Sequence, residues 1–382
     1  MTTPLRVLHL ITSLERGGAE VSMARLFETP TPDGIEHVGV ATLAGRDGAL
    51  ASRIRAAGVP VEPVGGGGPA AVWSRWRKLV AKCQPDILHA WLIHPATLLT
   101  VVPHGLPLVL GIHHSLDSLA GEKFRSIAII RGLALLSRRA DRICYVSQTS
   151  RCQHEGIGYP AAKGAVIPNG FLTHDIPAAP TGAQALREQL GIPDGGFLFG
   201  QLARSHPIKG HEVMLRAFAA VARARADVRL VLIGAGTDSC DGPIQSLAIE
   251  LGIADRVHGL GERDDVPTLL SGLDCLVNPS WSEALPNAVA EGMLARLPTI
   301  ATAVGDTELL LGDHGIAVRP GDIDGLTQTM IGLAGTPPRD RAALGQAGHD
   351  HIAGHFSREA MARRYAALYA DIAAKRRPGA LR

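Results

Sequence analysis

The sequence predicts an α/β protein built from two doubly wound, Rossmann-like parallel sheets with helices on both faces. Short apolar runs of strand length alternate with longer amphipathic stretches along most of the chain. The 382 residues are 46% hydrophobic but only 4% aromatic, so the cores must be mainly aliphatic, as in parallel sheets buried on both faces. A chain of this length also favours two domains over one.

The first half of the chain begins with a buried strand. The run LRVLHLIT near the amino terminus is too short and too lightly charged for a signal peptide. Longer amphipathic stretches separate the later apolar runs and predict crossover helices. We expect strands at residues 5–12, 37–42, 86–91, 108–112, 142–146 and 165–167. We expect helices in the stretches 19–27, 73–83 and 123–137.

The alternation lapses between residues 171 and 196, which are rich in Pro, Ala and Gly, and then restarts. The second set of strands is expected at 197–202, 229–234, 256–259, 274–278 and 298–301. The sequence therefore predicts two domains, a linker and a C-terminal helix that packs back on the first domain and ends in a frayed basic tail. The boundaries that we expect for these four parts are 1–175, 176–195, 196–355 and 356–382.

Charge and cysteine content restrict the partners and the compartment. The net charge of +2 argues against a nucleic-acid partner. Residues 1–170 hold 18 Lys and Arg against 12 Asp and Glu, a balance of +6, which leaves −4 for the remainder. The basic half suits an anionic acceptor or an anionic membrane surface, although uneven surface charge is common in proteins. Residues 73–78 combine Trp with cations, as helices at a membrane surface do, although such a helix can also pack its apolar side on its own sheet. Five dispersed Cys and no apolar run near 18 residues predict a cytoplasmic protein, at most peripheral on the inner face of the cytoplasmic membrane.

The stretch NPSWSEALPNAVAEGMLARLPTIATAVGDTE, residues 278–308, combines groups that bind anions and hydroxyls. Pro286 suits the first position of a helix, and the free N–H groups at a helix start favour an anion. Glu283 lies in the preceding loop, and Glu291 lies about one turn into the helix. Carboxylates accept hydrogen bonds from hydroxyls, so the two residues could hold two separate polyols, such as a sugar and a ribose.

This stretch resembles the E-x7-E region of the retaining glycosyltransferases of the GT-B fold, glycosyltransferase family 4 (also called group 1). Further matches occur in the order that the family shows, and together they span residues 5–372. They are ERGGAE at 15–20, VS at 146–147, VIPNG at 166–170, LAR at 202–204 with KG at 209–210, VLIGAG at 231–236 and VHGL at 257–260. The resemblance implies an acceptor-side first domain and a second domain that binds a nucleotide-sugar, facing each other across a cleft.

The resemblance assigns four charged residues of the second domain to the donor. Arg204 and Lys209 are expected to bind the diphosphate, because two fixed cations neutralise a pyrophosphate as it becomes the leaving group. Glu283 is expected to contact the donor-sugar hydroxyls as a catalytic residue, and Glu291 is expected to contact the ribose. Each residue also has an ordinary interpretation without a ligand. Arg204 and Lys209 could be exposed surface cations, Glu283 a loop carboxylate in solvent, and Glu291 a charge that favours the start of its helix.

Backbone groups are also assigned to the donor by the resemblance. The amides at Leu285 and Asn287 are expected to contact the sugar or the phosphate. Gly17 and Gly18 follow the first strand and would let the backbone approach the diphosphate, since they carry no Cβ, although a Gly pair is often only a turn. Glu20 fits a carboxylate in the first turn of a helix better than a ligand.

A histidine follows the strand at 108–112. The family carries a His at the end of this strand, near the donor sugar and the acceptor, and counting from Pro107 makes His113 this catalytic residue. His114 stays open as the alternative, since a slip of one residue gives that position. A His there could polarise a hydroxyl or hold a sugar by hydrogen bonds.

No metal ion and no cofactor are expected. Asp322 and Asp324 form a DxD, which chelates metal in the other large glycosyltransferase fold, but they begin a helix-like stretch and suit helix capping. Gly234 and Gly236 lack the third glycine of a dinucleotide fingerprint. The 16 His show no HExxH and no cluster with Cys, so the nucleotide-sugar is the one small molecule implied, as a substrate.

The implied function is retaining, metal-independent transfer of a sugar from a UDP- or GDP-sugar to a glycan or lipid-linked acceptor in the biosynthesis of a cell-surface polysaccharide or glycolipid. Two alternatives stay open. A nucleotide-sugar 2-epimerase on the same two-domain plan would convert the donor without an acceptor. A non-catalytic nucleotide-sugar binding protein would bind the donor without turnover. Ala284-Leu285 replaces a frequent Gly-Phe of the family, which could alter the choice of sugar.

Overall fold

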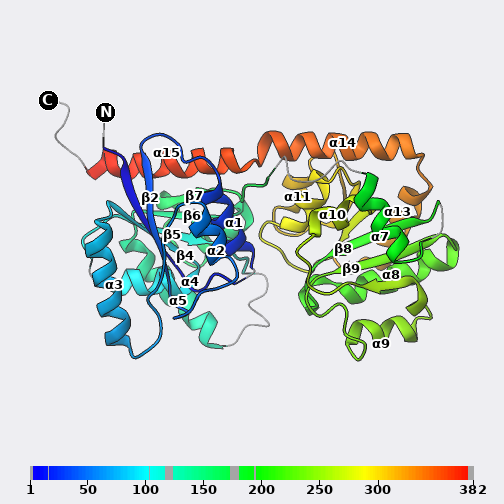
Figure 1. Cartoon of the computed structure of the whole chain (residues 1–382), viewed down its shortest axis with the longest axis horizontal. Coiled ribbons are helices and arrows are strands. Elements are labelled where there is room, and N and C mark those ends of the chain that lie inside the picture. The colour runs from blue at the N-terminus through cyan, green and yellow to red at the C-terminus, as the bar shows by residue number, and fades with distance from the viewer. Residues whose placement is uncertain are drawn as a thin grey trace. The chain divides into compact units, whose positions relative to one another are not determined.

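The computed structural model describes residues 3–15, 17–102, 104–116, 124–172, 180–192 and 195–376. Its contacts divide the chain into two compact units (Figure 1). Unit 1 comprises Met1–Gly170 and Phe356–Arg382, and unit 2 comprises Phe171–His355. Each unit holds one sheet, and every pair of neighbouring strands in it is parallel. The predicted fold class, two doubly wound parallel sheets, is confirmed.

Unit 1 is built on a seven-stranded sheet with the order β3-β2-β1-β4-β5-β6-β7. The strands are β1 (Leu5–Ile11), β2 (Ile35–Thr42), β3 (Val61–Pro63), β4 (Ile87–Trp91), β5 (Leu108–Ile112), β6 (Arg142–Tyr145) and β7 (Gly164–Val166). The central strands β4 and β5 are buried along their whole length, because helices cover both faces of the sheet. In this register His9 of β1 lies beside His89 of β4.

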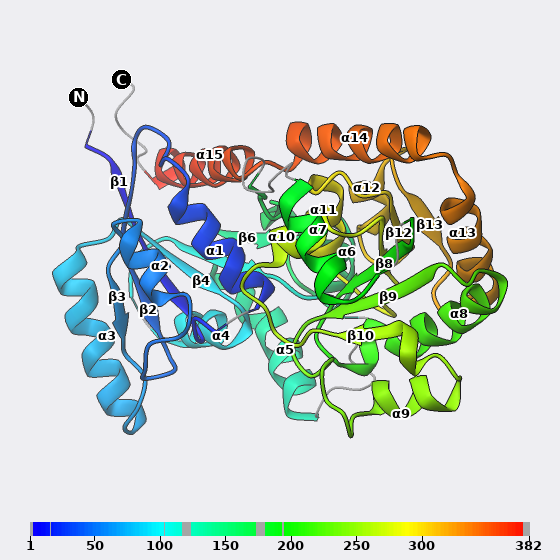
Figure 2. The same cartoon turned by 45° about the vertical axis from the view of Figure 1, so that its right-hand side comes forward.

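Helices cover both faces of the unit 1 sheet (Figure 2). They are α1 (Gly18–Glu28), α2 (Ala51–Ala56), α3 (Pro69–Cys83), α4 (Ile93–Val101), α5 (Phe124–Leu136), α6 (Gln148–Gly156) and α15 (Arg358–Arg376). One core cluster joins Met23 of α1 to Tyr369 of α15, so the last helix of the chain packs beside the first. A second cluster, on the other face, joins Trp76 of α3 to Leu133 of α5.

Unit 2 holds a six-stranded sheet with the order β10-β9-β8-β11-β12-β13. Its strands are β8 (Phe197–Leu202), β9 (Val228–Ile233), β10 (Val257–Gly259), β11 (Cys275–Asn278), β12 (Thr299–Thr302) and β13 (Ile316–Val318). Its helices are α7 (Pro180–Gln189), α8 (His211–Ala224), α9 (Pro243–Glu250), α10 (Val266–Ser271), α11 (Asn287–Leu294), α12 (Thr307–Leu311), α13 (Ile323–Gly335) and α14 (Pro338–His355). One core cluster packs α8, α9 and α13 on one face, and another packs α7 and α10 on the opposite face.

Three segments differ from the sequence prediction or extend it. Part of the stretch 176–195, predicted as a linker, is helix α7, whose Leu186 is buried against α10. The edge strands β3 and β13 were not predicted, because each has only three residues. The basic tail after residue 376 lies outside the described residues. Within the described part of the chain, no helix combines the length and the apolar character that a membrane span needs.

Candidate active site

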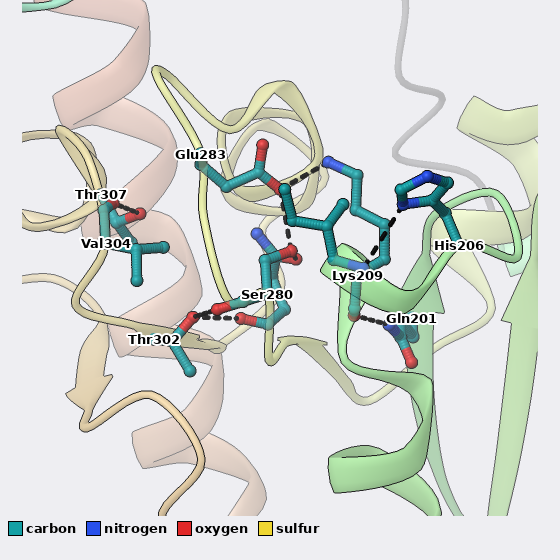
Figure 3. Close-up of polar contacts among 10 residues, drawn as sticks. Gln201, His206, Lys209, Ser280, Glu283, Thr302, Val304 and Thr307 are labelled. Atoms are coloured by element: carbon teal, nitrogen blue, oxygen red, sulfur yellow. Dashed lines mark hydrogen bonds and ion pairs between the residues drawn. The ribbon is translucent and has the colours of Figure 1, made fainter. Parts of the chain in front are cut away.

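The candidate site of unit 2 lies where three neighbouring parallel strands end. β11 pairs with β8 on one side and with β12 on the other. Because the carboxyl ends of parallel strands meet at one edge of a sheet, the loops after these strands are neighbours. Figure 3 shows the polar contacts that join the loops.

Two of the residues predicted to bind the donor form an ion pair at this edge (Figure 3). Lys209 Nζ lies 2.6 Å from Glu283 Oε1. The two side chains are 24% and 13% exposed, so the pair is shielded but still reachable from solvent. A cation and a carboxylate held together in this way can contact an anionic group and a hydroxyl group of the same ligand.

A buried hydroxyl network holds Glu283, and the sequence analysis missed it. Ser280 Oγ lies 2.8 Å from Glu283 Oε1 and 2.9 Å from Asn278 Oδ1. Thr302 Oγ1 donates a hydrogen bond of 2.6 Å to Ser280 O, which joins the loop after β11 to the end of β12. The one available signal was the three-residue spacing of Ser280 and Glu283, a separation at which polar side chains in a turn often meet.

The turn that carries Lys209 is fixed through its main chain. Lys209 ends a 3₁₀ turn, Pro207–Lys209. Gln201 Nε2, at the end of β8, donates a hydrogen bond of 2.8 Å to Lys209 O (Figure 3). Trp281 N donates a hydrogen bond of 2.8 Å to Ile208 O, which ties this turn to the loop of Glu283.

Two glycines allow these loops to lie close together. Gly210 has a φ of 67°, and a Cβ there would lie 2.0 Å from Pro279 O. Gly305, in the loop after β12, has a φ of 57°, and a Cβ there would lie 2.1 Å from Glu283 O. Both positions combine a left-handed backbone with contact against a neighbouring main chain, so both require glycine.

Arg204, the other predicted diphosphate ligand, lies exposed in the same loop as Lys209. Main-chain hydrogen bonds of 2.8 Å, from Ala203 N to Ile233 O and from Ser205 N to Ala235 O, tie this loop to the end of β9. Among the described residues no carboxylate pairs with Arg204, in contrast to Lys209. Its guanidinium is therefore available to an anionic ligand.

The remaining predicted donor residues of unit 2 follow Glu283 along the chain. Leu285 is buried, and Asn287 begins α11. Pro286 directly precedes α11, whereas the sequence predicted that it would be the first residue of the helix. Glu291 lies half-buried one turn into this helix. The structure thus places Leu285, Asn287 and Glu291 on the loop and helix that extend from the Lys209–Glu283 pair.

In unit 1, Gly17 and Gly18 lie at the start of α1, after the carboxyl end of β1. Gly17 O accepts a hydrogen bond of 2.9 Å from Val21 N. A Cβ at Gly17 would lie 2.3 Å from Glu20 Oε2, so glycine leaves room for that carboxylate at the helix start. Burial raises the pKa of Glu20. Glu20 occupies the first turn of α1.

His113 directly follows β5 and stacks on Trp91. The ring centroids are 4.8 Å apart and the planes differ by 11°. Burial lowers the pKa of His113 to about 4, so its imidazole is neutral at neutral pH. Within the described residues, neither ring nitrogen has a hydrogen-bond partner. The neutral imidazole therefore has a donor and an acceptor to offer, although both nitrogens are buried, so a ligand hydroxyl would reach them only if the neighbouring groups move.

His114, the alternative histidine, has different surroundings. Its ring meets the ring of His154 on α6 edge-on, with centroids 5.0 Å apart. Ser150 Oγ donates a hydrogen bond of 2.7 Å to His114 O. Burial lowers the pKa of His114 to about 3. The two consecutive histidines are thus both neutral, but one packs on Trp91 and the other on α6.

A buried network adjoining His113 was not predicted. Trp91 Nε1 donates a hydrogen bond of 3.1 Å to His9 Nδ1, so the proton of a neutral His9 ring is on Nε2. That nitrogen then donates to His37 Nδ1, 2.9 Å away. His89 Nδ1 lies 2.8 Å from Tyr369 Oη on α15. Strand pairing and the packing of α15 bring these side chains together, so no local pattern could have revealed them.

No metal centre is recognisable in the parts of the chain that the structure describes, since no group of three or more His, Cys, Asp or Glu there could hold an ion. Asp322 of the DxD accepts a hydrogen bond of 2.8 Å from Gly325 N and caps α13, as the sequence predicted.

Comparisons with known proteins agree with the resemblance seen in the sequence. Residues 6–193 match the family model described as "Glycosyltransferase Family 4", and residues 196–335 match the model described as "Glycosyl transferases group 1". The two matches follow one another along the chain, so together they cover most of both units.

Curated relatives and a solved structure extend this comparison. The GDP-mannose-dependent monoacylated alpha-(1-6)-phosphatidylinositol monomannoside mannosyltransferase of Corynebacterium glutamicum is 28% identical over 245 residues, which are 61% of this chain and 63% of the relative. The D-inositol 3-phosphate glycosyltransferase of Stackebrandtia nassauensis is 32% identical over 183 residues, or 44% and 40% of the two chains. This chain thus spans less than two thirds of either relative. The crystal structure of Anabaena HepE in complex with UDP and glucose is similar with a TM-score of 0.83 and 23% identity, covering 96% of this chain and 100% of that chain.

Proposed function

Because this chain belongs to the group 1 glycosyltransferases, glycosyltransferase family 4, we propose that it transfers a sugar from a nucleotide-diphosphate donor to an acceptor hydroxyl with retention of configuration. The observation that carries the proposal is the contact of 2.6 Å between Lys209 and Glu283 at the carboxyl edge of a Rossmann-like sheet. A nucleotide-sugar is a ligand that needs both groups, since its pyrophosphate is anionic and its sugar carries hydroxyls.

The charged residues of unit 2 have separate roles in this proposal. The bond that breaks joins the anomeric carbon to the β-phosphate oxygen, and the departing diphosphate gains negative charge. Lys209 and Arg204 stabilise this charge, the first as a point charge and the second through its planar fork. Glu283 accepts hydrogen bonds from donor-sugar hydroxyls, and Glu291 accepts them from the ribose.

Neutral groups complete the proposed machinery. The backbone amides at Leu285 and Asn287 donate to the sugar or the phosphate. Gly17 and Gly18 let the backbone approach the diphosphate, because they carry no Cβ and the start of α1 is a favourable place for an anion. His113 holds a substrate hydroxyl through its uncharged ring, and the lowered pKa of about 4 supports the neutral state that this role needs.

We propose that no metal ion is required, because Arg204 and Lys209 provide the positive charge that a bound cation supplies in other phosphate chemistry.

The donor is a UDP- or GDP-sugar. Two comparisons support these bases: HepE was crystallised with UDP, and the Corynebacterium relative is named for GDP-mannose. The acceptor is a glycan or lipid-linked intermediate of a cell-surface polysaccharide or glycolipid, in keeping with the phosphatidylinositol mannoside in that relative's name.

Peripheral contact with an anionic membrane is proposed for helix α3 of unit 1. Arg75, Arg77 and Lys78 are exposed on this helix. Trp76 is buried in the core and cannot insert into lipid, so the attraction would be electrostatic. Sedimentation with vesicles containing phosphatidylserine should deplete the protein at low salt but not at high salt, whereas neutral vesicles should not bind. Equal binding to both vesicle types would contradict the proposal.

The reaction itself is tested in two stages. A thermal-shift screen against UDP-, GDP-, ADP- and TDP-sugars identifies the donor by the rise in melting temperature on binding. Proton NMR then follows that donor with and without a panel of glycan and lipid-linked acceptors. Release of the nucleoside diphosphate that depends on the acceptor, with an unchanged anomeric coupling in the product, supports a retaining transferase. Conversion of the donor alone would instead indicate an epimerase, and binding without turnover would indicate a binding protein.

A further inference from the structure

Trp281 is an exposed tryptophan in the loop of the candidate site. It is the sole tryptophan among residues 171–355, lies two residues before Glu283 and is 51% exposed. Exposure alone carries no argument, since single exposed apolar side chains are common on protein surfaces. Trp281 differs from such residues in what its ring packs on and in its position in the loop of the candidate site.

The indole ring rests on a glycine that leaves room for it. Gly321, in the turn between β13 and α13, has a φ of 74°. A Cβ at Gly321 would lie 2.5 Å from Trp281 Cη2 and 2.7 Å from Cζ3. The six-membered ring of the indole therefore packs directly on main chain, at the end of the next strand but one from β11 in the sheet.

The main chain of Trp281 is fixed as firmly as its ring. Its N–H donates to Ile208 O at 2.8 Å, one residue before Lys209. The neighbouring Ser280 and Ser282 side chains are buried. The loop that carries Glu283 therefore also presents a packed aromatic surface, which lies over the turn after β13 at the carboxyl edge of the same sheet. A rigid aromatic surface loses little conformational entropy when a ligand binds.

We propose that Trp281 is a stacking platform for a pyranose ring of the carbohydrate substrate, an inference that rests on the proposed function. One face of a pyranose exposes several C–H groups, and an aromatic ring offers the flat apolar surface that such a face covers. Hydroxyls at the edge of the stacked sugar remain free for hydrogen bonds to polar groups of the site, of which Glu283 is the nearest along the chain. The platform would orient either the donor sugar or the acceptor sugar, and kinetics distinguish these two sources.

The first test is kinetic. Trp281→Ala should raise the KM of the stacked substrate about fivefold to tenfold, in line with the value of an aromatic contact. Trp281→Phe should keep most of the affinity. Gly321→Ala should produce the same KM change although the tryptophan itself is retained, because a Cβ at residue 321 displaces the indole ring. A rise in the KM for acceptor identifies an acceptor site, and a rise in the KM for donor identifies a donor site.

The matched control is Ile249→Ala on α9, an exposed apolar residue of the same unit with 62% exposure, which should leave both KM values unchanged. Circular dichroism melting separates loss of fold from loss of stacking. If Trp281→Ala does not fold, Trp281→Phe and Gly321→Ala still test the proposal. Unchanged KM values for donor and acceptor in folded Trp281→Ala would overturn it.

The second test does not depend on turnover. Saturation with donor, or with a soluble acceptor glycan, should change the tryptophan fluorescence of the wild-type chain. The change should be clearly smaller in Trp281→Phe, in which any signal left comes from the other tryptophans, such as Trp91 beside His113. If the wild type binds sugar with this signal but shows no transfer with any donor, the stacking site stands and the proposed reaction fails. If the wild type transfers sugar but its fluorescence change on binding equals that of Trp281→Phe, the proposed reaction stands and the stacking site fails.

Discussion

Lys209 and Glu283 depend on each other at the scale of single residues. The ammonium lies 2.6 Å from the carboxylate, and Ser280 Oγ contacts the same carboxylate oxygen. Removal of either partner leaves the other charge partly buried without its counterion, which costs more than the loss of an exposed pair. A substitution at either position therefore changes the place where a diphosphate and a sugar hydroxyl would bind.

Lys209→Ala should reduce kcat about 10²- to 10³-fold, because one of the two cations that stabilise the departing diphosphate is lost. Arg216→Ala is the matched control, since Arg216 is a half-exposed cation on α8 that pairs with Glu212. Its rate should equal that of the wild type. The measurement is the initial rate of nucleoside diphosphate release at saturating donor and acceptor. An unchanged kcat in Lys209→Ala would remove this residue from the mechanism.

Helix α15 illustrates the scale of secondary-structure elements, because it belongs to the core of unit 1 although it ends the chain. Tyr369 lies within hydrogen-bond distance of His89 on β4, and both residues are fully buried. A Cβ at Gly170 would lie 2.5 Å from the Cα of Arg358, so the start of the helix packs directly on main chain. The docking of α15 therefore combines apolar packing with buried polar contacts, which include those of Ser22 Oγ and Gly170 N with Met361 Sδ.

Tyr369→Phe should lower the stability of the protein by about 1–3 kcal/mol, because His89 Nδ1 would lose its partner while the aromatic ring stays in place. Urea unfolding monitored by circular dichroism measures the change. In the His89→Phe background the same substitution should cost much less, since the contact is already absent. Equal costs in both backgrounds would show that the hydroxyl does not act through His89.

Periodicity predicts most elements of this fold but few of the contacts between them. The buried strands β4, β5 and β8 are found from their continuous apolar runs, because both faces of each are covered. The edge strands β3 and β13 are too short for a pattern, and α7 lies where Pro, Ala and Gly conceal its apolar face. Among the candidate site residues, Lys209 and Glu283 were predicted individually from the family resemblance. Their contact was not, because it joins residues 74 positions apart.

The molecule as a whole holds several buried neutral histidines, and this makes its stability depend on pH. Burial lowers the pKa of His37, His113 and His211 to about 4. In the unfolded chain the pKa of a histidine is ~6.5, so between pH 4 and this value the unfolded state binds more protons than the folded state. Stability is therefore fully present above pH ~6.5 and is lost as the pH falls toward 4, by up to ~1.4 kcal/mol per pH unit for each histidine.

Urea midpoints measured at pH 7.5, 6 and 5 test this dependence, and they should decrease in that order. His113→Phe keeps an aromatic ring against Trp91 but cannot titrate, so its midpoint should fall less steeply with pH than that of the wild type. A profile that is flat for the wild type, or equally steep for the variant, would contradict the burial of a neutral imidazole at His113.

Removal of divalent metal should leave the activity of the whole enzyme largely unchanged. The proposed reaction needs positive charge where the diphosphate departs, and Arg204 and Lys209 supply two such charges in the segment that follows β8. The measurement is the initial rate after dialysis against EDTA, compared with the rate after Mg²⁺ is restored. Lys209→Ala serves as the control. If Mg²⁺ raises the initial rate of this variant but not that of the wild type, Lys209 provides in the wild type the positive charge that the metal ion can replace. Strict dependence of the wild-type rate on Mg²⁺ would instead show that these two side chains are insufficient, and the leaving group would then need a metal site that includes groups other than Arg204 and Lys209.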